Sequence, residues 1–107
     1  MATDLPDPVR AVIEAANAGD VDAFLACFPP DGVVDDWGRE FRGHMAIRGW
    51  SDQEFIGVHV TLSVLDVAIA DADVVVTAQV GGDGFNGPSH FTFRLGDGHV
   101  DRMTIRA

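Results

Sequence analysis

Hydrophobic residues in the first half of the chain recur at helical spacing. The pattern predicts a first helix over residues 7–17, a second over residues 21–28 and a third from residue 44 to about residue 53. Prolines at the start of the first helix, and a glycine followed by an aspartate before the second, are typical helix boundaries. The apolar positions that carry these periods are Val9, Val12, Ile13, Ala16, Val21, Phe24, Leu25, Phe28, Met45, Ile47 and Trp50.

Beyond Gly57 the spacing of apolar residues changes from helical to alternating. One long extended run covers residues 58–69, and three further strands are predicted over residues 74–80, 89–95 and 100–105. Alternation of this kind places apolar side chains on one face of a sheet and polar side chains on the other. The second half of the chain is therefore predicted to form a sheet.

Glycine, proline and aspartate mark the connections between these elements. A double proline precedes a short strand predicted over residues 33–36, and residues 37–40 are predicted to form a turn after it. Residues 71–73 and 96–98 are predicted as tight turns. Residues 81–88 contain too many glycines for regular structure and are predicted as a loop.

The order of the predicted elements indicates the fold class. Helices followed by a run of antiparallel strands predict an α+β domain, with the helices packed on one face of a strongly curved, mostly antiparallel sheet. A length of 107 residues with 47% hydrophobic residues is enough for one core and argues against disorder. We therefore expect residues 1–107 to form a single domain.

The charge of the chain narrows the range of partners. It has 17 acidic and 7 basic residues, a formal net charge of −10, and every basic residue is an arginine. An acidic surface repels phosphate backbones and anionic lipid heads, so neither nucleic acid nor a membrane surface is expected as a partner. The absence of lysine excludes Schiff-base chemistry.

Cysteine and histidine usage gives no indication of a metal or redox site. Cys27 is the only cysteine, which excludes an intrachain disulfide, and it is expected to be a small core residue. The four histidines do not pair at metal-ligand spacing, so we expect neither a metal nor a cofactor. The chain begins without a signal-peptide pattern and has no apolar run of membrane-spanning length, so a cytoplasmic location is expected.

Two adjacent acids in the first strand are the most chemically informative feature. Asp35 and Asp36 lie between valines and Trp37. Successive side chains of a strand point to opposite faces, so at most one of these carboxylates belongs to the interior. An interior carboxylate beside an aromatic ring is a candidate general base. The alternative is that the pair is a solvated strand end.

Four short motifs, each weak alone, occur in an order and spacing that are fairly specific for one fold. They are Asn17-Ala18-Gly19-Asp20, the step from Phe28 to Asp36, Phe41-Arg42-Gly43 with Ala46-Ile47-Arg48 and Trp50, and Ser89 to Phe93 before a Gly-Asp-Gly turn. Together they resemble the nuclear transport factor 2-like superfamily, in particular its SnoaL-like and ketosteroid isomerase-like branch, over nearly the whole chain. The resemblance implies a cone-shaped α+β barrel with an apolar pocket, and dimers through the outer face of the sheet.

The same resemblance implies roles for individual residues. Asp36 falls where ketosteroid isomerases place their proton-abstracting aspartate. Val12 stands where those enzymes have an enolate-stabilising tyrosine, and Ser89 stands where they have a protonated acid. Because the chain contains no tyrosine, the usual oxyanion hole cannot be built, and steroid isomerisation by that mechanism is not expected.

The sequence allows two interpretations for each of the other polar residues. If Asp36 faces the pocket, Asp35 is expected to be a solvated or interface charge, and a one-residue register error would exchange their roles. His59 alternates with valines in the long extended run and is the second candidate for acid–base work, with a surface or interface histidine as the alternative. Arg39 or Arg42 could reach a substrate carboxylate or hold Asp36 ionised.

The pocket wall is expected to be mainly apolar. Trp37 is expected to line the pocket or cap its mouth, with a plain core or rim aromatic as the alternative. Trp50 is expected to be a core residue, and the glycine-rich loop from Gly81 to Gly87 is interpreted as the pocket rim. The residues expected to contact a ligand are Val12, Trp37, Trp50, Ser89, Phe91, Phe93, Met103 and Ile105.

These observations lead to two hypotheses. The first is a SnoaL-like pocket protein that isomerises, cyclises or transfers a proton on a compact apolar or polyketide-like molecule, without a cofactor and with Asp36 as the base. The second is a non-catalytic ligand-binding or dimerisation module that keeps the fold. An inward Asp36 near His59 favours the enzyme, whereas an inward acid paired with Arg39 or Arg42 favours the module. In both cases a homodimer through the outer sheet face is expected.

Overall fold

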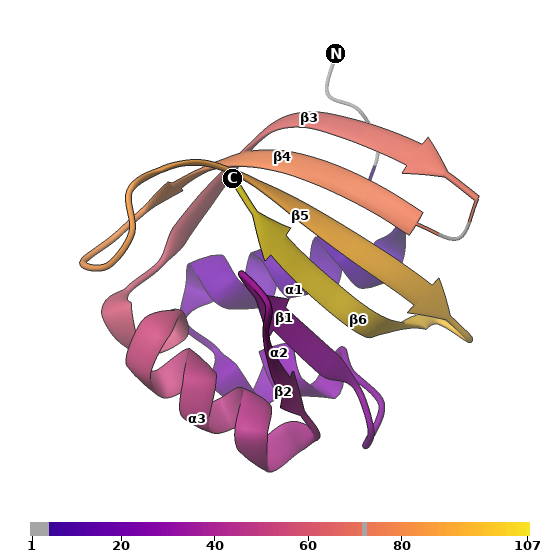
Figure 1. The fold of residues 1–107 in the computed structure, drawn as a ribbon, viewed down its shortest axis with the longest axis horizontal. Coiled ribbons are helices and arrows are strands. Elements are labelled where there is room, and N and C mark those ends of the chain that lie inside the picture. The colour runs from indigo at the N-terminus through magenta and orange to yellow at the C-terminus, as the bar shows by residue number, and fades with distance from the viewer. Residues whose placement is uncertain (1–4, 72) are drawn as a thin grey trace.

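The computed structural model describes residues 5–71 and 73–107, which form helices packed against one six-stranded sheet (Figure 1). Ten elements follow one another along the described chain. They are α1 Asp7–Ala18, α2 Val21–Ala26, β1 Val33–Asp36, β2 Arg39–Arg42, α3 His44–Glu54, the 3₁₀ turn η1 Ile56–Val58, β3 Thr61–Ala70, β4 Asp73–Gly81, β5 Gly87–Gly96 and β6 His99–Arg106.

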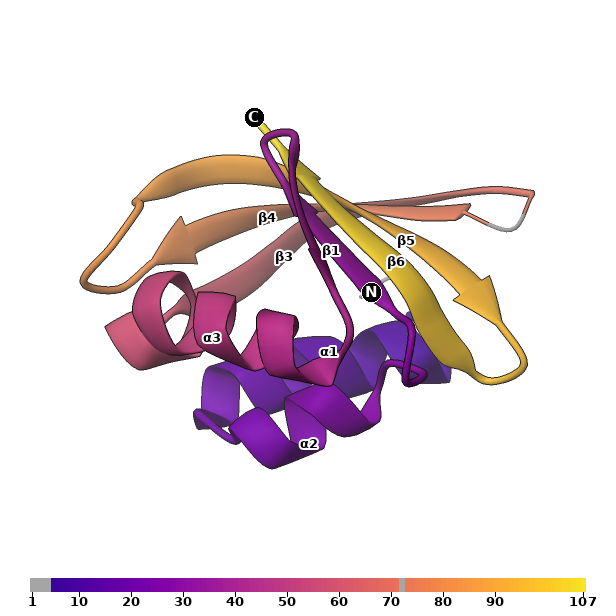
Figure 2. The same cartoon turned by 60° about the horizontal axis from the view of Figure 1, so that its bottom comes forward.

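The sheet is mixed and strongly curved. Its strand order is β2-β1-β6-β5-β4-β3, and β1 runs parallel to β6 while every other neighbouring pair is antiparallel. Figure 2 shows the sheet arching over the helices, which all lie on the same side of it. The predicted α+β cone, with helices on one face of a mostly antiparallel sheet, is confirmed.

The core fills the space between the helices and the concave face of the sheet. Val9 and Val12 of α1 are completely buried, as are Val76 of β4 and Phe93 of β5. The predicted helix stripes and strand alternations therefore meet in one apolar cluster.

Residues 17–20 dock α1 on the sheet and set the boundary between α1 and α2. Asn17 docks α1 on the sheet, because its Nδ2 donates to the Leu62 carbonyl at 3.0 Å and its Oδ1 accepts from the Leu62 N–H at 2.7 Å. Gly19 ends the helix with a left-handed φ of 71°, and the Asp20 carboxylate caps α2 by accepting from the Ala23 N–H at 3.0 Å. The motif around Asn17 therefore has a physical role in placing both helices.

Several local predictions differ from the structure. The loop predicted over residues 81–88 is shorter, because β4 ends at Gly81 and β5 begins at Gly87. Helix α2 ends at Ala26 rather than Phe28, because the N–H groups of the last two predicted helical residues donate to carbonyls three residues back, which closes a tighter turn. The turn predicted over residues 37–40 contains only Trp37 and Gly38, both with positive φ, while residues 39–42 form strand β2. Ala72, in the predicted turn 71–73, lies outside the described residues.

A further difference concerns the start of the long extended run predicted over residues 58–69. Residues 56–58 form the turn η1 instead of strand, and His59 follows it with a left-handed φ of 56°. The apolar residues that alternate there belong to the linkage between α3 and β3, so His59 does not belong to a strand.

Within the described residues, no helix is long and apolar enough to cross a membrane.

Candidate functional site

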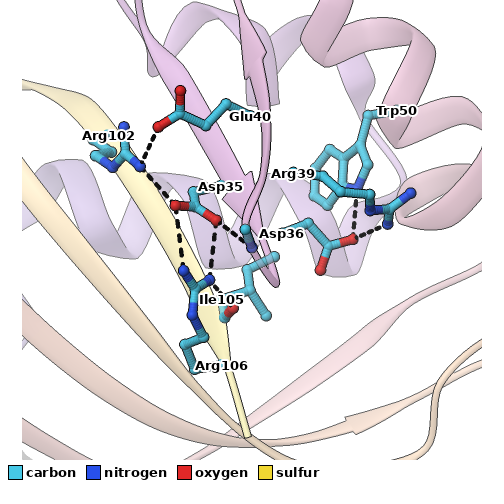
Figure 3. Close-up of polar contacts among 9 residues, drawn as sticks. Asp35, Asp36, Arg39, Glu40, Trp50, Arg102, Ile105 and Arg106 are labelled. Atoms are coloured by element: carbon cyan, nitrogen blue, oxygen red, sulfur yellow. Dashed lines mark hydrogen bonds and ion pairs between the residues drawn. The ribbon is translucent and has the colours of Figure 1, made fainter.

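The hairpin of β1 and β2 carries the two adjacent acids to opposite faces of the sheet. In Figure 3 the carboxylate of Asp35 points toward Arg102 and Arg106, and the carboxylate of Asp36 points the other way, toward Trp50. The pleat of strand β1 causes this separation. Asp36 lies on the concave side, where it lines a cavity.

One oxygen of the Asp36 carboxylate is held in place by two donors. Trp50 Nε1 donates to Asp36 Oδ2 at 3.0 Å, and Arg39 Nη2 donates to the same oxygen at 2.7 Å. The other oxygen, Oδ1, has no hydrogen-bond partner among residues 5–71 and 73–107 (Figure 3). The Asp36 side chain is only 15% exposed. The carboxylate is therefore fixed in orientation with one acceptor oxygen left for a further donor.

Arg39 is shared between two acids. Its Nη1 donates to Glu54 Oε2 at 3.0 Å, and its Nη2 donates to Glu54 Oε1 at 2.7 Å in addition to Asp36. The hydrogen bonds from Arg39 lower the pKa of the Glu54 carboxyl. The guanidinium also lies 5.6 Å from the ring centroid of Phe41, within cation–π range.

The cavity beside Asp36 has a volume of about 400 Å³ and mostly apolar walls. Aromatic side chains form a large part of the wall, and two of them, Trp50 and Phe55, stack with their ring centroids 4.9 Å apart. Helix α3, the turn η1 and strands β1, β2, β4, β5 and β6 all contribute to the lining, together with the loop after β4. The lining residues are Asp36, Trp37, Arg39, Trp50, Gln53, Glu54, Phe55, Val58, Val60, Val80, Gly81, Gly84, Phe85, Ser89, Phe91 and Ile105.

The structure brings some of the expected ligand-contacting residues together and separates others. Those that line the cavity beside Asp36 are Trp37, Trp50, Ser89, Phe91 and Ile105. Val12, Phe93 and Met103 are completely buried in the core and are not among the lining residues. Each belongs to the apolar core cluster.

His59 is not among the residues that line the cavity. Its side chain is 82% exposed, and its Nδ1 lies 2.7 Å from the Asp83 Oδ2. The Asp83 N–H also donates to the Val58 carbonyl at 2.8 Å, so this contact ties the glycine-rich loop to the turn before β3. The expectation that His59 projects from a strand is wrong, because this residue terminates η1 in a left-handed conformation.

Asp35 is buried rather than solvated. Its side chain is 8% exposed and accepts hydrogen bonds from Arg102 Nη2 at 2.6 Å and Arg106 Nη1 at 3.0 Å. The Gly38 N–H donates to Asp35 Oδ1 at 2.7 Å, which closes the hairpin turn. The bond from Arg106, with further donation from Gly38 and Arg102, lowers the pKa of Asp35 despite burial. Two arginines from β6 cover a carboxylate that the sequence placed at the surface.

Sequence reasoning did not identify several lining residues. Glu54, which holds Arg39, and Phe55, which follows it directly, both line the cavity and were not among the candidate residues. The available signal was a large aromatic residue directly after the acid, since Phe55 lies at the end of α3 and is buried. The glycine-rich loop, interpreted from the sequence as the pocket rim, contributes Gly81, Gly84 and Phe85 to the lining.

The structure is a small α+β cone, and its fold is similar to one described as ketosteroid isomerase-like. The SnoaL-like domain family matches residues 9–103, and the chain belongs to this family. A search of curated proteins found no match.

Several solved structures have a similar fold. A putative polyketide cyclase from Sinorhizobium meliloti is 29% identical, with a TM-score of 0.85 and 96% of each chain covered. A hypothetical protein with a ketosteroid isomerase-like fold from Catenulispora acidiphila, solved in complex with trimethylamine, is 22% identical, with a TM-score of 0.82 and coverage of 97% of this chain and 87% of that one. The Anabaena orange carotenoid protein binding canthaxanthin is 21% identical, with a TM-score of 0.84, and the match covers 99% of this chain but only 37% of that one.

Proposed function

We propose that this protein binds a compact, mostly apolar small molecule in the cavity and that Asp36 Oδ1 accepts a hydrogen bond from it. The observation that carries the proposal is the state of the Asp36 carboxylate. One of its oxygens is anchored by Trp50 and Arg39, and the other has no partner in the described part of the chain. Such an oxygen in a cavity wall orients a ligand that offers a donor.

The size and walls of the cavity support a compact apolar ligand. A volume of about 400 Å³ lies in the range of small-molecule sites. Each Å² of apolar surface that a ligand buries there contributes roughly 25 cal/mol to the hydrophobic free energy. Aliphatic and aromatic side chains dominate the lining, with Ser89 and Gln53 as additional neutral polar groups. Two structures of similar fold contain a bound small molecule, trimethylamine in one and canthaxanthin in the other.

A second candidate function is proton transfer, with Asp36 as the general base of an isomerisation or cyclisation. The open Oδ1 favours it, because a base needs an oxygen within reach of the substrate proton. The 29% identical structure described as a putative polyketide cyclase points to the same class of reaction on a polyketide-like substrate. Binding takes first place because Arg39 pairs with Asp36 and His59 lies outside the cavity lining.

A ligand carried through purification tests the binding proposal. Native mass spectrometry of the purified protein, followed by denaturation and extraction, would identify a bound molecule. Ser89→Phe places a ring into the cavity wall, and Ala11→Phe places the same ring on the exposed surface of α1. We expect Ser89→Phe to lose the ligand and Ala11→Phe to keep it. Equal retention by both variants would contradict binding in this cavity.

Hydrogen exchange of a carbon acid tests proton transfer separately. β-Tetralone, a compact neutral ketone, exchanges its α-hydrogens with D₂O, and NMR follows the rate. If Asp36 is a general base, the protein accelerates this exchange and Asp36→Asn removes the acceleration. A rate equal to the buffer rate would argue against base catalysis on this class of compound and would leave the binding proposal intact.

We also propose that two copies pair through the outer face of the sheet. Val75, Thr92 and Thr104 are register partners across β4, β5 and β6, and each is only half-buried in the single chain. Short, uncharged side chains in such a row allow two sheets to approach closely. Thr92→Arg should convert the dimer to monomers in sedimentation velocity, while Ala18→Arg on exposed helix surface should not. A monomer in the unmodified protein would contradict the proposal.

A further inference from the structure

The charged side chains of the cavity do not balance. Among the described lining residues, the ionised groups are the carboxylates of Asp36 and Glu54 and the guanidinium of Arg39. Two carboxylates and one guanidinium leave one net negative charge beside mostly apolar walls. Glu54 and Arg39 are 40% and 54% exposed and pair with each other, whereas the Asp36 carboxylate is only 15% exposed. A charge in such a position favours an occupant of opposite sign, because its surroundings solvate it less well than bulk water does.

The one arginine of the lining is already engaged. Both of its terminal nitrogens donate to Glu54, at 3.0 and 2.7 Å, in the two-pronged geometry that suits a carboxylate. Its Nη2 also donates to Asp36 at 2.7 Å. An anionic ligand would have to displace these carboxylates and would meet the remaining negative charge. The lining therefore disfavours carboxylate and phosphate ligands.

The remaining walls suit a cation. Five aromatic side chains line the cavity: Trp37, Trp50, Phe55, Phe85 and Phe91. Aromatic faces attract ammonium groups through the ring quadrupole, and the attraction grows when water is excluded. Trp37 and Phe85 are also exposed, at 57% and 56%, which leaves aromatic surface accessible to an incoming molecule. The net charge of −10 on the whole chain adds a long-range attraction for cations.

From this charge and these walls we infer that the ligand carries a cationic amine on a compact apolar body, with an ammonium N–H that donates to Asp36 Oδ1. The inference rests on the proposed binding function and specifies its chemical class. A neutral alcohol would supply the hydrogen bond but would leave the negative charge uncompensated. An ammonium group supplies both, and its bond to a carboxylate is charge-assisted.

Three probes with the same ring and substitution position separate the contribution of the hydrogen bond from that of the charge. They are naphthylmethylamine, naphthalenemethanol and naphthoate. Isothermal titration calorimetry near neutral pH measures each one, with any co-purifying molecule first removed by unfolding and refolding. We expect the amine to bind about tenfold more tightly than the alcohol, because a charge-assisted hydrogen bond is roughly twice as strong as a neutral one. Naphthoate should show no binding. Equal or tighter binding of the alcohol would overturn the inference and leave the binding proposal standing.

Two variants test whether the Asp36 carboxylate causes the preference for the amine over the alcohol. Asp36→Asn keeps the shape of the side chain and removes its charge, so the amine should bind no better than the alcohol. Asp22→Asn is the matched control, because it removes an exposed charge paired with Arg48 on the helical side. If both variants lose the preference equally, overall charge explains it and the inference fails. If none of the three probes binds the unmodified protein, both the binding proposal and the inference that rests on it are overturned.

Discussion

Asp35 and Asp36 are consecutive residues whose carboxylates lie on opposite faces of one sheet and bind different partners. Asp35 accepts from Arg102 at 2.6 Å on the outer face. Asp36 accepts from Trp50 at 3.0 Å on the cavity side. Because the two residues share a strand, the hairpin turn that Asp35 closes through the Gly38 N–H also carries Asp36 to the cavity. The buried acid is thus a structural support for the neighbouring acid that lines the cavity.

Asp35→Asn should lower the free energy of unfolding by about 1–3 kcal/mol near neutral pH, because two arginines lose their charged acceptor. The folded state lowers the pKa of Asp35, so its stabilisation is fully present above the unfolded value of about 3.9 and is lost as pH falls through the lower folded value. The difference between the two proteins should therefore shrink below about pH 4. Urea denaturation at several pH values measures it. A difference that stayed constant into strong acid would contradict the ion-pair account.

Trp50→Phe should cost about 1–2 kcal/mol of stability, because it removes the Nε1 donor to Asp36 and some buried volume. Thermal and urea unfolding measure the loss. Trp37→Phe is the control, since that indole is 57% exposed and its change should have little effect. Similar losses in both variants would show that the hydrogen bond to Asp36 is not the cause.

Arg39→Gln should raise the pKa of Glu54 toward its ordinary value, because Arg39 is the group that lowers it. NMR titration of the Glu54 carboxyl carbon follows this change directly. The same variant makes the cavity more negative, so naphthylmethylamine should bind more tightly while naphthoate still fails to bind. Arg94→Gln, which breaks an exposed pair with Asp73, should leave both measurements unchanged. An unchanged Glu54 titration in Arg39→Gln would refute the assigned pairing.

Gly57→Ala should destabilise the protein by about 3 kcal/mol, because the new Cβ would lie 1.6 Å from the Asp52 carbonyl oxygen and force the backbone to move. The close approach lets α3 pass into η1 and places Phe55 and Val58 in the cavity wall. Gly49→Ala, with open space around its Cβ in the middle of α3, should instead stabilise by about 0.5–1 kcal/mol. Denaturation midpoints compare the two, and equal effects would contradict the packing argument.

His59→Ala should leave the affinity for naphthylmethylamine unchanged, because the imidazole is exposed and pairs only with Asp83 among the described residues. Calorimetry on this variant beside Asp36→Asn makes the comparison. A loss of affinity similar to that of Asp36→Asn would restore His59 as a member of the site.

The sequence by itself determined the elements and the fold. Regular spacing of apolar residues is a local property, so helices α1 and α3 and strands β4 to β6 could be predicted within a few residues. The strand pleat also required Asp35 and Asp36 to face opposite sides, because alternation is intrinsic to an extended chain. The irregular linkage before β3 was missed, since a 3₁₀ turn followed by a left-handed residue resembles alternation when only side-chain polarity is read.

Only the tertiary structure decided which groups meet. Arg102 and Arg106 cover Asp35 from a strand 67 and 71 residues away in sequence, and Glu54 reaches Arg39 from the far end of α3. It also separated Val12, Phe93 and Met103 from the cavity wall, although their polarity and spacing resemble those of Phe91 and Ile105. The physical reason is that hydrogen bonds, ion pairs and cavities depend on distances between elements, and sheet curvature and helix docking set those distances. Sequence spacing fixes only the face that each side chain takes within its own element.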